Sequence, residues 1–168
     1  IAPYEKVINQ VDLDSIDKRE IKVRHDVKAR IEEFNALAGC EKIHIGMTSR
    51  DLTENIELIQ IKKALEVIHQ KSLQTLFLLN KKIEKYQKTY MVGRSHNVAA
   101  QVTTLGKRFA SCAEELLFAV DLLENLLERL PFRGLKGPVG TSQDALNAMG
   151  SLKELEKLEE NLAKQFNF

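Results

Sequence analysis

Tryptophan is absent from this sequence of 168 residues, and cysteine, proline and glycine are scarce, with two, three and eight residues. No apolar run approaches the roughly 20 residues that a membrane-crossing helix needs. Cys40 and Cys112 are far apart and lack neighbours at metal-site spacing, so neither a disulfide framework nor a zinc site is indicated. These scarcities are typical of a helix-rich soluble protein of the reducing cytoplasm.

An excess of one charge sign is also missing, because 25 basic side chains are balanced by 24 acidic ones and the formal net charge is +1. No long block of a single sign interrupts the chain. A general nucleic-acid surface or a surface for acidic membranes is therefore not expected.

Apolar residues recur in steps of three and four from Leu58 to Tyr90, which predicts an amphipathic helix from Asp51 to Tyr90. At about 1.5 Å per residue this helix would be roughly 60 Å long. A second pattern from Leu105 to Leu130 predicts another long helix, ended by Pro131. Since no alternating strand pattern of useful length occurs, the sequence predicts an all-α fold, an elongated bundle of long helices.

Two shorter helices are predicted on either side of the long ones. An amphipathic pattern covers Arg24 to Leu37, and Ser151 followed by Glu154 forms a capping box for a helix from Leu152 to about Gln165. We expect residues 1–50 to be part of an amino-terminal helical domain and residues 51–168 to be part of a central domain of long helices.

Three of the four histidines, His25, His44 and His96, lie in the connections between helices or at their edges. A histidine near a helix end is more often a structural hydrogen-bonding residue than a catalyst. His25 has charged neighbours on both sides: Asp26 could orient the ring or cap the next helix, and Arg24 could bind an anion.

The stretch KIHIGMTSRDLTEN immediately precedes the longest helix pattern, and it has two interpretations. Asp51 with Glu54 can be a capping box, and the neighbouring residues can be no more than cap residues. Alternatively, the hydroxyls of Thr48 and Ser49 and the free N–H groups at the start of a long helix can bind a carboxylate.

Four strings occur in one order, with the long helix between the second and the third: RHDV, IHIGMTSRD, GRSHNVAAQVTTLGKR and RGLKGPVGTSQD. Together they resemble the adenylosuccinate lyase family of the fumarase/aspartase superfamily, over nearly the whole chain from Ile21 onward. The resemblance implies a reversible β-elimination that releases fumarate from adenylosuccinate, leaving AMP, and from the succinylated aminoimidazole carboxamide ribotide of purine synthesis.

The resemblance also implies roles for individual residues. His96 in GRSH matches the general acid, and Ser95 stands where the family has a threonine that contacts the substrate. Thr48 and Ser49 match residues that hold the substrate carboxylates. His25 matches a histidine that contacts the substrate and helps to orient His96.

By the same matching, His44 and Asp51 belong to the pocket motif, as supporting residues. Arg24 and Asp26, beside His25, are also expected to bind the substrate. Lys107 and Arg108 are more simply explained as a solvated helix face than as a phosphate contact. The family works as a homotetramer with active sites shared between subunits, and the resemblance implies a small-molecule nucleotide substrate and no cofactor.

Two family elements do not occur in the sequence: the mobile loop that carries the serine base, and the amino-terminal arginine and tyrosine that hold the nucleotide phosphate. We therefore expect these 168 residues to be an internal fragment that is inactive alone. A non-enzymatic helical oligomerisation module is the alternative from another class. Argininosuccinate lyase and fumarase are alternatives within the superfamily, although RHDV and KGPVGT fit them poorly.

Overall fold

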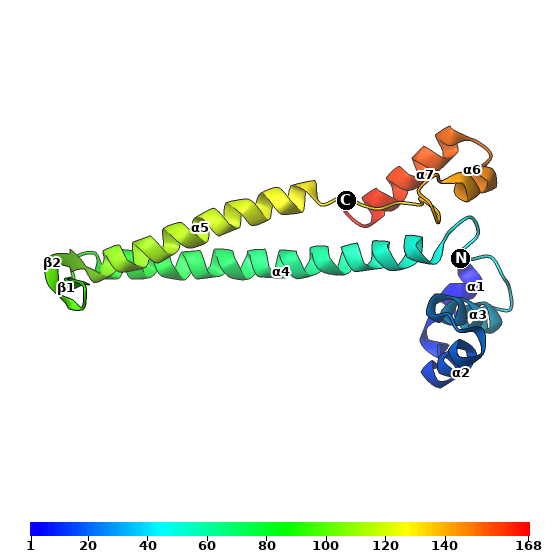
Figure 1. Cartoon of the computed structure of the whole chain (residues 1–168), viewed down its shortest axis with the longest axis horizontal. Coiled ribbons are helices and arrows are strands. Elements are labelled where there is room, and N and C mark those ends of the chain that lie inside the picture. The colour runs from blue at the N-terminus through cyan, green and yellow to red at the C-terminus, as the bar shows by residue number, and fades with distance from the viewer. The chain divides into compact units, whose positions relative to one another are not determined.

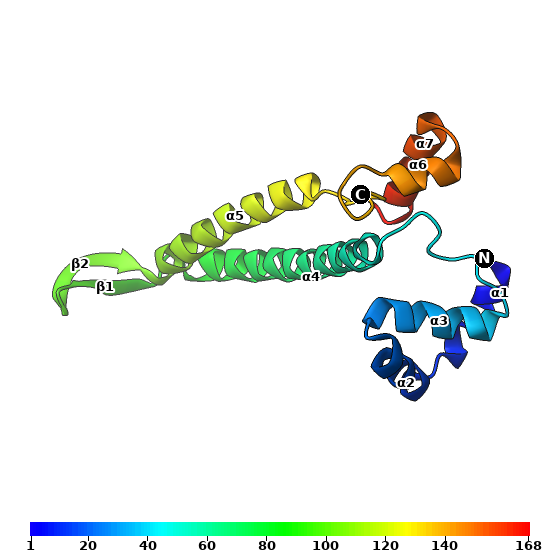
Figure 2. The same cartoon turned by 45° about the vertical axis from the view of Figure 1, so that its right-hand side comes forward.

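Helices dominate the computed structural model, which describes residues 1–168 (Figure 1; Figure 2). The elements in chain order are α1 (Ala2–Glu5), the 3₁₀ turn η1 (Ile8–Gln10), α2 (Leu13–Val23), α3 (Asp26–Ala38), α4 (Ser49–Tyr86), β1 (Tyr90–Ser95), β2 (Val98–Thr104), α5 (Leu105–Arg129), α6 (Gln143–Met149) and α7 (Leu152–Gln165). The all-α prediction is confirmed apart from one two-stranded sheet. None of the helices combines the length and the apolarity that crossing a membrane requires.

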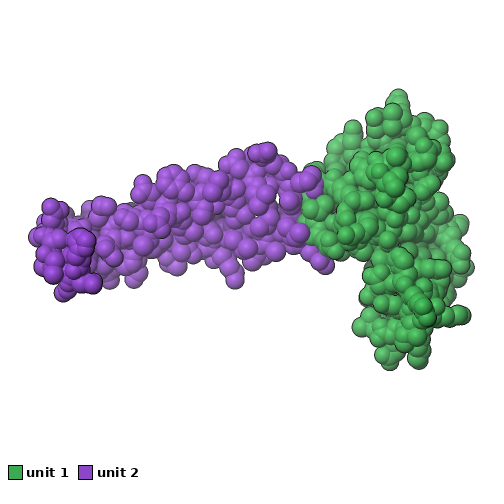
Figure 3. Space-filling model, in the orientation of Figure 1, with its two compact units in different colours: residues 1–58, 132–168 green, residues 59–131 purple.

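The chain forms two compact units, coloured separately in Figure 3. The first unit comprises residues 1–58 and 132–168, and the second unit comprises residues 59–131. The expected division between residues 50 and 51 concerns the domains of a larger fold and stays a prediction.

The second unit is a helical hairpin in which α5 runs back along α4 (Figure 1; Figure 2). His69 of α4 and Glu124 of α5 form an ion pair across it, with 2.7 Å between Nε2 and Oε1. α5 begins after Thr104, whose hydroxyl accepts a hydrogen bond from the N–H of Lys107 at 3.1 Å. The two long helices of the sequence prediction are thus confirmed, with α4 ending four residues earlier than expected.

The sequence analysis did not predict the small sheet at the tip of the helical hairpin, where β1 and β2 pair antiparallel. The register runs from Tyr90 opposite Thr104 to Ser95 opposite Val98, and it shifts between Gly93 and Arg94, where Ala100 of β2 has no partner. Nearly every residue of both strands is solvent-exposed or half-exposed. Apolar and polar residues alternate along a strand when one of its faces is buried. Neither strand has a buried face, so the sequence shows no such alternation.

The first unit contains a small apolar core where α6 and α7 meet. Leu135, Ala145 and Leu155 are buried there, and Met47 packs against them. Ser151 caps α7 by accepting the N–H of Glu154 at 3.3 Å, which confirms the predicted start of this helix and the serine half of the capping box.

α2 is a helix that the sequence analysis did not predict, and it packs against α3. Arg24 ends α2 in the left-handed conformation, with φ at 54°, so the next helix begins at Asp26 rather than at Arg24. Glu33 of α3 is buried against α2, where its carboxylate accepts bonds from the Ser15 hydroxyl at 2.6 Å and from Arg19 Nε at 2.9 Å.

We predict that this buried carboxylate makes stability sensitive to acid. The Ser15 hydrogen bond, helped by Arg19, lowers the pKa of Glu33 below its usual value of 4.5, against the opposing effect of burial. The folded state therefore holds fewer protons than the unfolded chain. The stabilisation is present above pH 4.5 and is lost as the pH falls through the lowered pKa. Glu33→Gln should cost about 1–3 kcal/mol at neutral pH and flatten the acid limb of a urea-unfolding series, whereas Glu32→Gln should do neither.

Gly106 gives a second prediction, because it sits in the first turn of α5 against the end of α4. An added Cβ would lie 2.7 Å from the backbone of Gln87 and 2.9 Å from the carbonyl of Ile83. In a free helix, replacing glycine by alanine stabilises by up to about 1 kcal/mol. Gly106→Ala should instead lower the free energy of urea unfolding by about 1–3 kcal/mol, because helix backbones must separate. A stabilised variant would contradict this close approach.

Candidate functional site

The TSRD segment, residues 48–51, lies at the start of α4. Its acidic residue, Asp51, has a different role from the one that the sequence suggested. Asp51 is not the first residue of a capping box with Glu54. It is the third residue of the helix, and its Oδ2 accepts the N–H of Thr48 at 3.0 Å. Glu54 pairs with Arg133 instead. The hydroxyls of Thr48 and Ser49 have no protein partner, so both are free for a ligand.

A cavity of about 370 Å³ brings together four of the residues that the sequence singled out: His25, His44, Thr48 and Ser49. The other lining residues are Val27, Lys28, Ile31 and Met47. The cavity lies within the first unit, between the start of α3 and the start of α4. Two imidazoles, two hydroxyls and the amino-terminal end of a 38-residue helix form a suitable environment for a carboxylate.

His25 is held as the amino-terminal cap of α3. Its Nδ1 accepts the N–H of Lys28 at 3.2 Å, so Nδ1 carries no hydrogen of its own in this arrangement. A neutral ring then carries its hydrogen on Nε2, which can donate to a ligand. The carboxylate of Asp26 is 3.5 Å from the same Nδ1, a contact that only a protonated ring would make favourable.

His44 sits in a strained turn before α4, with φ at 65°. Its Nε2 is buried and has no hydrogen-bond partner in the protein. Two residues on, Gly46 also has a positive φ, and a Cβ there would lie 3.1 Å from the backbone of Asp144 and Ala145. The turn is therefore pressed against α6, and the unpaired His44 nitrogen leaves a polar position for a ligand to satisfy.

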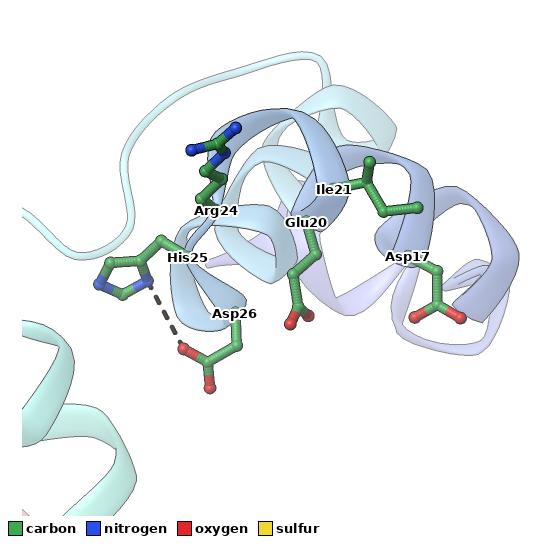
Figure 4. A pocket seen from close by; sticks show the side chains of 6 residues that line it. All are labelled: Asp17, Glu20, Ile21, Arg24, His25 and Asp26. Carbon is green, nitrogen blue, oxygen red and sulfur yellow. Dashed lines mark ion pairs between the residues drawn. The ribbon is translucent and has the colours of Figure 1, made fainter.

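Arg24 and Asp26 line a different hollow with His25, shown in Figure 4, of about 730 Å³. Asp17 and Glu20 line it as well, so the hollow has one guanidinium and three carboxylates among its lining residues. This charge balance does not favour an anion. The substrate-binding roles expected for Arg24 and Asp26 stay predictions.

Ser95 and His96 belong to the second unit, and neither lines the cavity at the start of α4. His96 and Asn97 form the two-residue turn of the β-hairpin, with φ values of 50° and 63°. Arg94 Nη1 donates to the carbonyl of Asn97 at 3.0 Å and braces the turn. The imidazole is solvent-exposed there.

Sequence reasoning missed the hydrogen bonds that connect the TSRD segment to the RGLKG segment, residues 133–137. Asp51 is 1% exposed, and its Oδ1 accepts bonds from Arg133 Nε at 3.3 Å, from the N–H of Lys136 at 3.0 Å and from the N–H of Gly137 at 3.2 Å. Its Oδ2 also accepts the Gly137 N–H, at 3.1 Å. Both segments are recognisable strings, but nothing in the sequence indicates that they bind each other.

Asn55 and Glu159 hold the same segment from two helices. The Asn55 side chain donates to the carbonyl of Gly134 at 2.9 Å and accepts its N–H at 3.1 Å. Glu159 of α7 accepts the N–H of Leu135 at 2.9 Å and pairs with the ammonium of Lys136 at 2.8 Å. Residues 134–137 are thereby fixed between α4 and α7.

A family model described as lyase matches residues 1–167. The adenylosuccinate lyase of Schistosoma mansoni is 34% identical over 166 residues, which cover 95% of this chain and 34% of that protein. The adenylosuccinate lyase of Saccharomyces cerevisiae is 32% identical, over 96% of this chain and 34% of that protein. The chain thus spans about a third of the length of these curated relatives.

Solved structures show the same fold at low sequence identity. A fumarate lyase from Mesorhizobium sp. BNC1 superposes with a TM-score of 0.82 at 20% identity, over 99% of this chain and 39% of that one. The 3-carboxy-cis,cis-muconate lactonizing enzyme of Pseudomonas putida gives 0.78 at 20% identity, over 94% of this chain and 36% of that one. The predicted superfamily fold is therefore confirmed.

The cap formed by His25 gives a prediction that does not depend on activity. His25→Ala should lower the free energy of unfolding by about 1 kcal/mol, because the N–H of Lys28 loses its acceptor. His25→Asn should stay within a few tenths of the unmodified protein, since asparagine is a good cap. Urea unfolding followed by circular dichroism measures both. Equal losses in the two variants would mean that the ring stabilises the fold by some means other than capping.

Proposed function

We propose, since this chain belongs to the lyase family, that it is part of an adenylosuccinate lyase that eliminates fumarate from adenylosuccinate and from succinylaminoimidazole carboxamide ribotide. The substrates are small nucleotides, and the proposed reaction uses no cofactor. The proposed location is the cytoplasm, which agrees with the two free thiols of Cys40 and Cys112.

The cavity at the start of α4 is the observation that carries this proposal. Thr48 and Ser49 present hydroxyls without protein partners beside His25 and His44. The first N–H groups of a helix have no partner within the helix, and its dipole favours an anion there. A carboxylate of the succinyl group fits these donors, and His44 Nε2 gains the partner that it lacks in the protein.

The elimination needs two proton transfers around one bond that breaks. A base removes a proton from the carbon beside a carboxylate, the bond from the neighbouring carbon to nitrogen breaks, and an acid protonates the departing nitrogen. Fumarate and AMP are then the products. We assign the acid role to His96, with Ser95 beside it as a substrate contact, and the substrate-orienting role to His25. The base is not assigned to any of these 168 residues.

The proposal includes a homotetramer in which His96 and the TSRD segment of one site come from different copies. Ser95 and His96 do not line the cavity that Thr48 lines, so another copy would supply them to the site. The second unit also exposes many large apolar side chains, as an association surface would. They include Ile61, Val67, Ile68, Leu73, Phe77, Leu78, Leu117, Phe118, Leu122 and Leu126.

His96→Gln in the protein of the complete reading frame tests the acid role. We expect kcat for adenylosuccinate to fall by about 100-fold or more while KM changes much less, because the acid acts in the transition state. The loss of adenylosuccinate absorbance measures the rate. Turnover within a few-fold of the unmodified enzyme would remove His96 as the acid. No turnover by the unmodified protein would favour a non-enzymatic oligomerisation module, and turnover of argininosuccinate or malate instead would favour the alternative lyases.

Mixing two impaired variants tests the shared site. His96→Gln and Thr48→Val copies, unfolded together and refolded, should regain about a quarter of the unmodified activity, because random assembly leaves that fraction of sites with both residues intact. Each variant refolded alone is the control. No recovery in mixed oligomers would place both residues of a site in one copy.

A further inference from the structure

We infer that Asp51 is a positioning residue that fixes the hydroxyls of the TSRD segment and the Lys136–Ser142 loop against each other through one carboxylate. The inference rests on the proposed function, because it concerns how Thr48 comes to meet the substrate. Asp51 itself is buried and does not line the cavity.

The carboxylate of Asp51 accepts more hydrogen bonds than capping the start of a helix requires. Three backbone N–H groups and one guanidinium converge on it, from Thr48 on one side and from Arg133, Lys136 and Gly137 on the other. A buried charge is tolerated only when such donors compensate its lost hydration. Both oxygens are needed, because the donors approach from two segments that are distant in the sequence.

Each of the two segments depends on this carboxylate for its alignment. The N–H of Thr48 donates only to Asp51, while the Thr48 hydroxyl is left free. On the other side, the N–H of Ser142 donates to the carbonyl of Lys136 at 2.9 Å and closes the Lys136–Ser142 loop, whose first two N–H groups donate to Asp51. The two segments are therefore joined to each other through this carboxylate.

Charge compensation explains why an acidic residue can stand beside a proposed carboxylate site. Arg133 pairs with Asp51 and also with Glu54, and its side chain is 24% exposed. Arg133 thereby compensates the charge of Asp51. The free N–H groups at the start of α4 remain available to a second anion.

A double-mutant cycle on kcat/KM distinguishes positioning from mere stabilisation. Thr48→Val removes a hydroxyl with no protein partner, so it should lower kcat/KM by about 10-fold or more without changing stability. Asp51→Asn keeps the size of the side chain but turns one acceptor into a donor that faces other donors. It should lower kcat/KM by about 100-fold. In the Asp51→Asn background, Thr48→Val should then cost less than about twofold, because the hydroxyl is already misplaced.

Asn55→Ala is the matched control. Asn55 lies one turn further along α4, is also buried, and holds the same segment through Gly134. Its side chain also donates to the carbonyl of Asp51 at 2.6 Å, but no hydrogen bond joins it to the Asp51 carboxylate or to Thr48. Asn55→Ala should lower the melting temperature and leave the cost of Thr48→Val at about 10-fold. If Thr48→Val costs as much in the Asp51→Asn background as in the unmodified enzyme, the inference is overturned. If the unmodified enzyme has no lyase activity, the proposed function fails instead.

Amide hydrogen exchange tests the positioning role of the Asp51 carboxylate without any assay of activity. The N–H groups of Thr48, Lys136 and Gly137 share one acceptor, so in the unmodified protein they should open together with similar protection. Asp51→Asn should accelerate exchange at all three, and Asn55→Ala should accelerate only Gly134. Protection factors that differ more than about tenfold among the three amides of the unmodified protein would overturn the inference that one carboxylate holds both segments. This test stands even if Asp51→Asn fails to fold.

Discussion

The carboxylate of Asp51 lies almost without solvent exposure between the start of α4 and the segment that follows α5, and four donors converge on it. Removing a charge from water costs several kcal/mol, so the surrounding backbone must keep its donors in place. The first turn of α4 and residues 133–137 are consequently tied together, although some 80 residues separate them in the sequence. Thr48, which lines the cavity, belongs to one of the two segments that Asp51 joins.

The site residues of the first unit are divided between structural and free groups. One ring nitrogen of His25 accepts the hydrogen bond that caps α3, and the backbone N–H of Thr48 donates to Asp51. What remains are the other nitrogen of His25, the hydroxyl of Thr48, that of Ser49, and the unpaired nitrogen of His44. The protein framework therefore uses part of His25 and of Thr48 and leaves these other groups without a protein partner.

Local sequence signals predicted what local chemistry determines. Periodicity indicated the two long helices, and the Ser151 capping box indicated α7, because both signals act within a few turns of one helix. The bonds of Asp51 to residues 133–137 could not be predicted, since they join segments whose pairing depends on the fold. Nor could the β-hairpin, because its strands have no buried face that would impose alternation. For the site, motif resemblance found the residues of the cavity, but only the coordinates separate His25, His44, Thr48 and Ser49 from Arg24 and Asp26.

The second unit lacks a core of its own. Among residues 59–131 only Gly106 and Val120 are buried, although the apolar periodicity of both helices is strong. Two helices in contact bury one stripe each, and the apolar faces left exposed cost free energy until another surface covers them. The His96 turn is carried at the tip of this hairpin. In the proposed enzyme, the association that covers the apolar faces is thus also the step that delivers the acid, so that assembly and activity depend on the same surface.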